Sequence, residues 1–129
     1  MEDGNVYNWA LIAAGIVGCI VAVYHGIDMQ KWMIRPILGK TPLTQSSRRL
    51  VPLLLHFSTI FWFLGGVALI VVPMVAGASA ALTTAVFVGA FYTFGAIGNF
   101  WGTNGKHPGW ILLGVDVALI VYGTLPLVG

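Results

Sequence analysis

The sequence predicts an all-α integral membrane protein, a four-helix bundle with antiparallel, up-down topology. Of its 129 residues, 58% are hydrophobic and only 8% are charged, and the mean hydropathy is +0.91. Soluble domains carry about a quarter of their residues as Asp, Glu, Lys or Arg. Four apolar runs reach the length of about 20 residues that a helix needs to cross a hydrocarbon core about 30 Å thick. Water is therefore not the expected solvent of this chain.

The predicted spans fill most of a single transmembrane domain, 1–129. They are residues 6–24, 50–72, 80–101 and 110–128. None of these runs alternates polar with apolar residues, as the strands of a membrane barrel do. Short links rich in turn-forming residues join the second span to the third and the third to the fourth, so these helices are expected to be antiparallel neighbours. The spans leave no room for a separate catalytic domain and no catalytic motif occurs, so we expect no enzyme.

The connection between the first two spans is longer and has an amphipathic pattern. Four apolar residues recur there at i, i+3, i+4 and i+8: Met29, Trp32, Met33 and Ile37. Three charged residues lie on another face: Asp28, Lys31 and Arg35. This pattern predicts a short interfacial helix that ends near Arg35, because Pro36 disfavours a helical conformation in the residue before it.

Charge distribution predicts the orientation of the spans. All six Lys and Arg residues lie in the first and third connections: Lys31, Arg35, Lys40, Arg48, Arg49 and Lys106. By the positive-inside rule, loops 25–49 and 102–109 are cytoplasmic and the N- and C-termini are outside. The start of the chain, Met1 to Asn5, is acidic and lacks the positive region of a cleavable signal peptide, so we expect the first span to be retained.

Two rows of small residues predict close helix packing. The first span carries Ala10, Ala14, Gly18 and Ala22, and the third carries Ala81, Ala85, Gly89 and Thr93. Such rows let helix backbones approach where lipid supplies no hydrophobic drive. Packing within the bundle is the favoured interpretation, and contact with another membrane subunit or a second copy is the alternative.

Polar side chains within or beside the spans are few, and each is a functional candidate because its burial costs free energy. The candidates are His25, His56, Asn99, His107 and Asp116. In the predicted orientation they all lie toward the cytoplasmic side, on different helices or connections. We therefore expect them to form one polar cluster.

Three interpretations of this cluster are open. In the first interpretation, its members satisfy one another's hydrogen bonds and only fix the register between the helices. Alternatively, the three histidines, with Asp116 as a ligand or an orienting group, hold haem, a metal ion or a quinone, although no H-x-x-x-H or H-E-x-x-H spacing occurs. In the third interpretation, Asp116 alternates between charged and neutral forms in a small proton-coupled transporter. Small multidrug transporters also have four helices, but their essential acid is a glutamate in the first helix, where this sequence has no acid.

Two segments resemble those of small, uncharacterised four-helix bacterial inner-membrane proteins. They are Arg48-Arg49…His56, which opens the second span, and Gly105-Lys106-His107-Pro108-Gly109-Trp110, which enters the last one. The resemblance implies a four-helix fold in a bacterial inner (plasma) membrane. It implies no activity and no site residues.

The preferred functional hypothesis is a non-catalytic accessory or assembly subunit of a larger membrane complex. Its expected partners are the lipid bilayer and other membrane subunits, or a second copy, through the small-residue helix faces. A protein that binds haem, a metal or a quinone is the alternative, followed by the proton-coupled transporter. No nucleic-acid partner is expected, because no basic surface lies outside the membrane zone.

Overall fold

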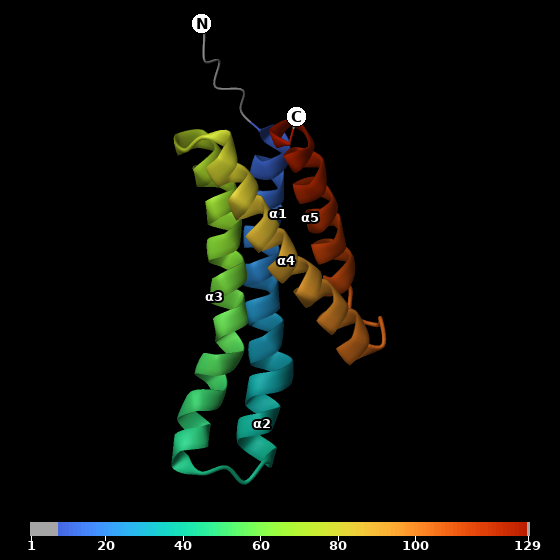
Figure 1. Cartoon of the computed structure of the whole chain (residues 1–129). Helices are drawn as coiled ribbons and strands as arrows, with labels where there is room; N and C mark the ends of the chain where they lie inside the picture. Colours follow the sequence, from blue (N-terminus) through green and yellow to red (C-terminus); the bar gives the residue numbers. More distant parts are fainter. Residues whose placement is uncertain (1–7, 129) are drawn as a thin grey trace, which may run out of the picture.

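The computed structural model describes residues 8–128, and every regular element within them is a helix. The long helices are α1 (Trp9–Met29), α3 (Gln45–Val75), α4 (Ala78–Thr103) and α5 (Gly109–Thr124), shown in Figure 1. A π-helical turn, Gln30–Ile34, and helix α2, Arg35–Lys40, continue α1, and the 3-10 turn Leu125–Leu127 follows α5. Four helical stretches of the described chain are long and apolar enough to cross a membrane: Trp9–Lys40, Gln45–Val75, Ala78–Thr103 and Gly109–Leu127. The prediction of an all-α protein with four long apolar helices is confirmed.

Helices α1, α3 and α4 extend beyond the predicted spans at their ends near the charged connections, whereas α5 ends at Thr124, before the predicted end at 128, and a 3-10 turn follows it. The predicted second and third spans, 50–72 and 80–101, lie inside α3 and α4. The predicted start of the first span at Val6, and the acidic segment Met1 to Asn5, lie outside the described residues. Thr44 begins α3 by accepting a hydrogen bond from the Ser47 N–H at 3.2 Å, as a good N-cap residue does.

The first connection differs from the prediction of a separate interfacial helix. One helical run continues from Trp9 to Lys40. Pro36 lacks an N–H, and its ring crowds the carbonyl four residues earlier. The π-helical turn widens the helix before this proline, and the Arg35 N–H donates to the carbonyl of Gln30, five residues back. Pro36 is thereby accommodated rather than ending the helix.

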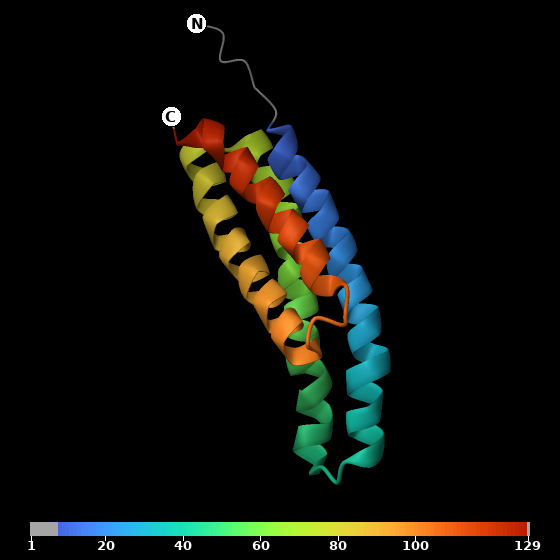
Figure 2. The ribbon, with the colours of Figure 1, turned by 90° about the vertical axis from the view of Figure 1, so that its right-hand side faces the viewer.

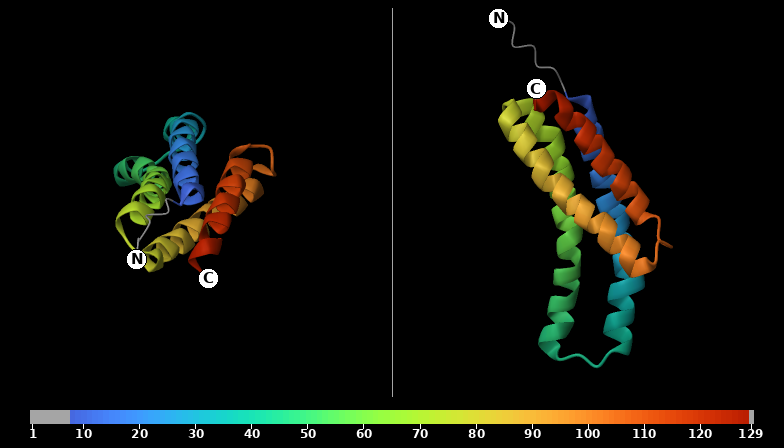
Figure 3. Two further views of the ribbon diagram at one scale, coloured as in Figure 1. Left: turned by 90° about the horizontal axis from the view of Figure 1, so that it is seen from above. Right: turned by 45° about the vertical axis from the view of Figure 1, so that its right-hand side comes forward.

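The four long helices form an uneven bundle. Helix α1 packs along α3 and α5, and α4 packs along α5 (Figures 1 and 2). Helix α4 runs obliquely away from α3 after the short link between them (Figure 3). Helix α2 and the start of α3 form a hairpin that projects past the α4–α5 connection. At the other end, Asn8 Nδ2 donates to the carbonyl of Gly123 at 2.6 Å, which joins the start of α1 to the end of α5.

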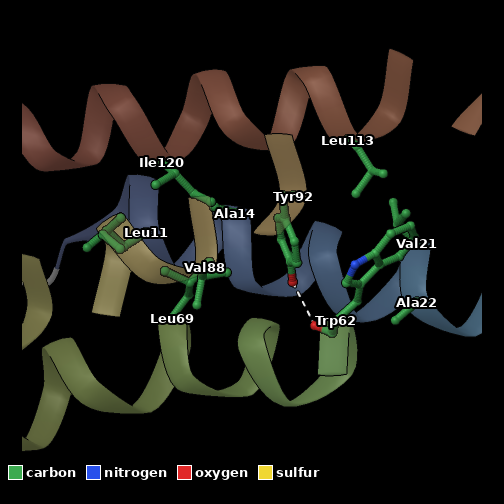
Figure 4. Packing of buried hydrophobic residues seen from close by; sticks show 11 residues of the cluster. Leu11, Ala14, Val21, Ala22, Trp62, Leu69, Val88, Tyr92, Leu113 and Ile120 are labelled. Atoms are coloured by element: carbon green, nitrogen blue, oxygen red, sulfur yellow. Dashed lines mark hydrogen bonds between the residues drawn. The ribbon is translucent and has the colours of Figure 1, made fainter. Parts of the chain in front are cut away.

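The core is assembled around Tyr92, which α4 inserts between the other helices (Figure 4). Its hydroxyl donates to the backbone carbonyl of Trp62 on α3 at 2.7 Å. Leu11, Leu69 and Leu113 are fully buried in the same hydrophobic cluster. This cluster therefore contains side chains from α1, α3, α4 and α5.

Small residues allow the closest helix approaches. A methyl group added to Gly15 of α1 would lie 2.5 Å from the carbonyl oxygen of Gly66 on α3, and one added to Gly18 would collide with the Tyr92 hydroxyl. Ala14 and Ala22, from the small-residue row of α1, are fully buried. This row is therefore used within the bundle.

The outer surface is strongly apolar. Large hydrophobic side chains stand out from every long helix, among them Phe94 at 78% and Trp101 at 82% exposure. In α3, only Trp62, Gly66 and Leu69 are buried along its 31 residues. Soluble monomers rarely expose contiguous apolar patches of more than a few hundred Å², so this surface requires an apolar environment or apolar partners.

Candidate functional site

A cavity of about 200 Å³ lies where the end of α1 meets the α4–α5 connection. Its lining residues are His25, Asp28, Met29, Trp32, Met33, Asn99, Thr103 and His107. Three residues of the predicted cluster, His25, Asn99 and His107, are thus brought together. His56 and Asp116 do not line this cavity.

The α4–α5 connection carries His107 back toward α1. Asn104, which follows the last residue of α4, has a φ of 50°, and Gly105 has a φ of 71°. Both values lie in the left-handed region. Asn and Gly tolerate this conformation best, and the Gly105 N–H donates to the carbonyl of Phe100 at 2.8 Å as the chain reverses. The reversal places His107 at the wall of the cavity, four residues after Thr103.

Both ring nitrogens of His107 are engaged. Nε2 lies 3.0 Å from Asp28 Oδ2, and the Gly109 backbone N–H donates to Nδ1 at 3.1 Å. Because Nδ1 accepts a hydrogen bond, the ring proton sits on Nε2 and is donated to the Asp28 carboxylate. Both contacts fix the orientation of the His107 ring, and neither nitrogen is free to bind a metal ion.

His25 is held by α3. Its Nε2 lies 3.1 Å from Ser58 Oγ, and that hydroxyl donates its own proton to the carbonyl of Leu55 at 2.9 Å. The hydroxyl must then accept from His25, so Nε2 carries a ring proton. The ring also packs on Trp62, with ring centroids 4.3 Å apart. Ser58 and Trp62 of α3 thus fix the His25 ring beside the cavity that it lines.

Asn99 carries an unsatisfied hydrogen-bond acceptor. Its side-chain Oδ1 is buried and has no hydrogen-bond partner among the described residues. Buried polar atoms without a partner are rare and costly, at about 1–3 kcal/mol each. One helical turn later, Thr103, which also lines the cavity, donates to the Asn99 backbone carbonyl at 2.7 Å.

The remaining two predicted site residues lie elsewhere. His56 Nε2 lies 3.0 Å from Gln30 Oε1, which ties α3 to the π-helical turn. Asp116 is fully buried on the inward face of α5, with Leu113 and Ile120, and neither carboxylate oxygen has a partner in the described part of the chain. The single cluster expected from the sequence is therefore divided into a cavity, a helix tie and an isolated buried carboxyl.

The cavity limits which cofactors fit. In residues 8–128, no group of three or more His, Cys, Asp or Glu side chains is placed to hold a metal ion. A protein cavity of about 150 Å³ holds one benzene molecule, so about 200 Å³ suits one six-membered ring with small substituents. The four linked rings of a porphyrin do not fit this volume. Of the ligands considered from the sequence, a quinone ring is the one whose size matches this volume.

The sequence did contain a signal for Asp28 as a site residue. Asp28 follows His25 by three residues, so both lie on one face of a helix. This relationship was hidden because the first helix was expected to end at Tyr24, before Asp28. Gln30 and Ser58, the partners of His56 and His25, gave no comparable signal, because neither is unusual in a helix.

Known proteins offer no guide to this site. Comparisons of the chain with protein-family models, with curated proteins and with solved structures find no match. The function of this chain must therefore be inferred from the geometry of the cavity and from the apolar surface around it.

Proposed function

We propose that this chain is a four-span membrane protein, with consecutive spans antiparallel, that binds a small ligand in the cavity between α1 and the α4–α5 connection. Support for the membrane location comes from four apolar helices of sufficient length and from the exposed apolar side chains along them. The six basic residues lie in loops 25–49 and 102–109. Both of these segments lie toward the end of the bundle opposite the two chain ends (Figure 1), as antiparallel spans require.

The proposed orientation places loops 25–49 and 102–109 in the cytoplasm and both termini outside. Single cysteines test it in a Cys19→Ala background, because Cys19 is the only natural cysteine. In intact cells, a membrane-impermeant maleimide should label Gly77→Cys, in the link between α3 and α4, and should not label Thr41→Cys, in the turn after α2. The reverse pattern would contradict this orientation.

One observation carries the ligand-binding proposal: Asn99, a residue that lines the cavity, has a buried side-chain Oδ1 with no partner in the described chain. A ligand that donates a hydrogen bond there would offset the cost of burying this atom. The accessory-subunit hypothesis has lost part of its support, because the small-residue row of α1 is buried inside the bundle. We therefore favour ligand binding over a purely structural role in a complex.

Native mass spectrometry of the protein released from mild detergent tests this proposal. We expect a small molecule to co-purify with the chain in a near one-to-one ratio. Asn99→Leu, which removes the acceptor and fills space, should lose it, whereas His56→Asn, a polar change outside the cavity, should keep it. Absence of any small molecule, together with another membrane protein at a fixed ratio, would instead favour the accessory-subunit hypothesis.

A further inference from the structure

We infer that the outward face of α3 and the groove between α3 and α4 bind one anionic phospholipid, with its phosphate on Arg49 and an acyl chain along α3. This lipid site depends on the proposed membrane location, but it lies away from the cavity between α1 and the α4–α5 connection. Three features support it: the charge at the start of α3, the residues that follow Arg49 on the same face, and the character of the groove.

The hairpin of α2 and the start of α3 carries a concentrated positive charge. It contains five of the six basic residues, Lys31, Arg35, Lys40, Arg48 and Arg49, and no acidic residue occurs from Met29 to Val115. Arg48 Nη1 donates to the carbonyl of Leu38 at 3.0 Å, which holds α3 against α2. The Arg49 side chain is exposed and has no hydrogen bond or ion pair within residues 8–128. Clusters of Lys and Arg beside a membrane span attract anionic headgroups, so Arg49 is free to bind a lipid phosphate.

The length of α3 places Arg49 at the level of the headgroups. Its 31 residues span about 46 Å at the standard helical rise, and a bilayer with its headgroups is about 40–45 Å thick. The first turns of α3 therefore lie among the headgroups of one leaflet. Phe61 follows Arg49 by about 18 Å along the helix, which is close to the depth of one leaflet. A lipid whose phosphate contacts Arg49 therefore reaches Phe61 with the end of an acyl chain.

An exposed apolar stripe leads from Arg49 toward the middle of α3. Its members are spaced three or four residues apart and are all exposed: Leu50, Leu53, Phe57, Phe61 and Leu64. This spacing keeps them on one side of the helix, and Arg49 borders that side, four residues before Leu53. Ser58 and Gly66, on the opposite side, contact α1. The stripe is therefore turned away from the bundle and is open to an acyl chain.

The stripe ends in a groove of about 460 Å³ between α3 and α4, where α4 diverges from α3 (Figure 3). Leu64 and Ala68 line it from α3, and Phe87 and Phe91 line it from α4. Among the described residues that line it, only Tyr92 has a polar side chain, and its hydroxyl is engaged by the Trp62 carbonyl at 2.7 Å. The part of a ligand that enters this groove must therefore be apolar.

The aromatic border of the groove favours an acyl chain over a transmembrane helix. The Phe61 ring lies between Phe57 and Phe91, with ring centroids 5.5 Å and 4.7 Å away. Helices in membranes approach closely through small residues, and bulky rings hold a second helix at a distance. A flexible hydrocarbon chain follows such an uneven surface. The positive charge at one end of the stripe and the apolar groove at the other match the two ends of an anionic phospholipid.

Native mass spectrometry of the full-length protein tests the headgroup contact. The protein is released from nanodiscs of equal parts phosphatidylglycerol and phosphatidylcholine with identical acyl chains. We expect one retained phosphatidylglycerol per chain, in about tenfold excess over phosphatidylcholine. Arg49→Gln should lower this excess by about fivefold. Lys106→Gln removes the same charge from the other basic connection and should leave the excess nearly unchanged.

A second pair of variants tests the groove. Ala68→Phe fills the groove and should abolish retention of the lipid, whereas Ala118→Phe, the same change at an exposed site on α5, should keep it. Circular dichroism checks that both variants are folded. Dihexanoyl phosphatidylglycerol has the same headgroup but chains too short to reach the groove, so the native chain should not retain it.

Several outcomes would overturn the inference. Equal retention of the two lipids would show that the anionic headgroup is not recognised, and retention that is insensitive to Arg49→Gln or to Ala68→Phe would place the lipid elsewhere. A lipid-free dimer that Ala68→Phe dissociates would assign the groove to a second copy. If no lipid is retained while a small molecule co-purifies and is lost in Asn99→Leu, the lipid site is wrong and the proposed function survives. If neither is retained, both fail.

Discussion

His107 Nε2 lies 3.0 Å from Asp28 Oδ2, although 79 residues separate them in the sequence. This hydrogen bond connects the end of α1 to the connection that leads into α5. It also closes one wall of the cavity, since both residues line it. The pair therefore determines how far the α4–α5 connection stands from α1.

The His107–Asp28 pair should contribute modestly to stability. Its side chains are 30% and 22% exposed, so solvent weakens the interaction relative to a buried pair. We expect Asp28→Asn and His107→Gln each to lower the free energy of unfolding by about 1 kcal/mol, with a coupling energy of about 0.5–1 kcal/mol between them.

A double-mutant cycle in mixed detergent micelles, followed by circular dichroism during titration with a denaturing detergent, measures this coupling. Thr103→Val, another polar change in the same cavity, serves as a control in a second cycle with Asp28→Asn. Strictly additive effects of Asp28→Asn and His107→Gln would show that the two side chains do not interact in solution.

The close approach of α1 and α3 at Gly15 and Gly66 is a second point to test. A methyl group on Gly66 would lie 2.7 Å from the Gly15 carbonyl oxygen, and overpacking typically costs about 1–3 kcal/mol. Gly66→Ala should therefore lower the thermal midpoint, while Gly98→Ala should not, because nothing lies within 4 Å of its added methyl group. Equal midpoints for Gly66→Ala and the native chain would mean that the two helices are farther apart than described.

Hydrophobic length predicted the number of helices, but it did not predict where the first helix ends. The four helices followed from hydrophobic length, which is a property of composition and needs no knowledge of packing. The first helix was predicted to end at Tyr24, where its apolar run ends, and a separate interfacial helix was expected to end before Pro36. The observed helical run continues to Lys40 instead, through a π-helical turn that has no sequence signature. That single error separated Asp28 from His25 and hid half of the cavity.

The composition of the site was only partly predictable for a different reason. Polar residues in apolar spans are visible in the sequence, which is how His25, Asn99 and His107 were found. Their distances depend on the register between helices, and no short-range pattern encodes that register. Asp116 looked equivalent to the others in the sequence, but it faces the core of the bundle rather than the cavity.

The hydroxyl of Tyr92 offers a third prediction. It donates to the Trp62 carbonyl at 2.7 Å in the buried core, and interhelical hydrogen bonds in membrane proteins contribute about 0.6 kcal/mol on average. Tyr92→Phe should cost about 0.5–1 kcal/mol of unfolding free energy, and Tyr122→Phe should cost less, because Tyr122 is 68% exposed. Unfolding in mixed micelles compares the two variants, and a larger loss for Tyr122→Phe would contradict the assignment.

Asp116 gives the last prediction, because its carboxyl is fully buried and unpartnered within residues 8–128. Burying a polar group without a hydrogen bond costs about 1–3 kcal/mol, and replacing it with an apolar group of similar size removes that cost. Asp116→Val should accordingly raise the free energy of unfolding by about 1–2 kcal/mol. Thr59→Val tests the same principle at a nearly isosteric site, because Thr59 Oγ1 is also buried without a partner in the described chain.

A substitution of Asp116 also tests whether this carboxyl carries protons across the membrane. In liposomes with an imposed pH gradient, we expect Asp116→Asn to leave the proton flux unchanged. Asp116 does not line the cavity of His25 and His107. It also has no hydrogen-bond partner among the described residues through which a proton could pass. If the native chain conducts protons and Asp116→Asn stops the flux while remaining folded, Asp116 is a coupling acid and the transport hypothesis replaces this interpretation. A loss of stability in Asp116→Val would likewise show that the carboxyl has a stabilising partner.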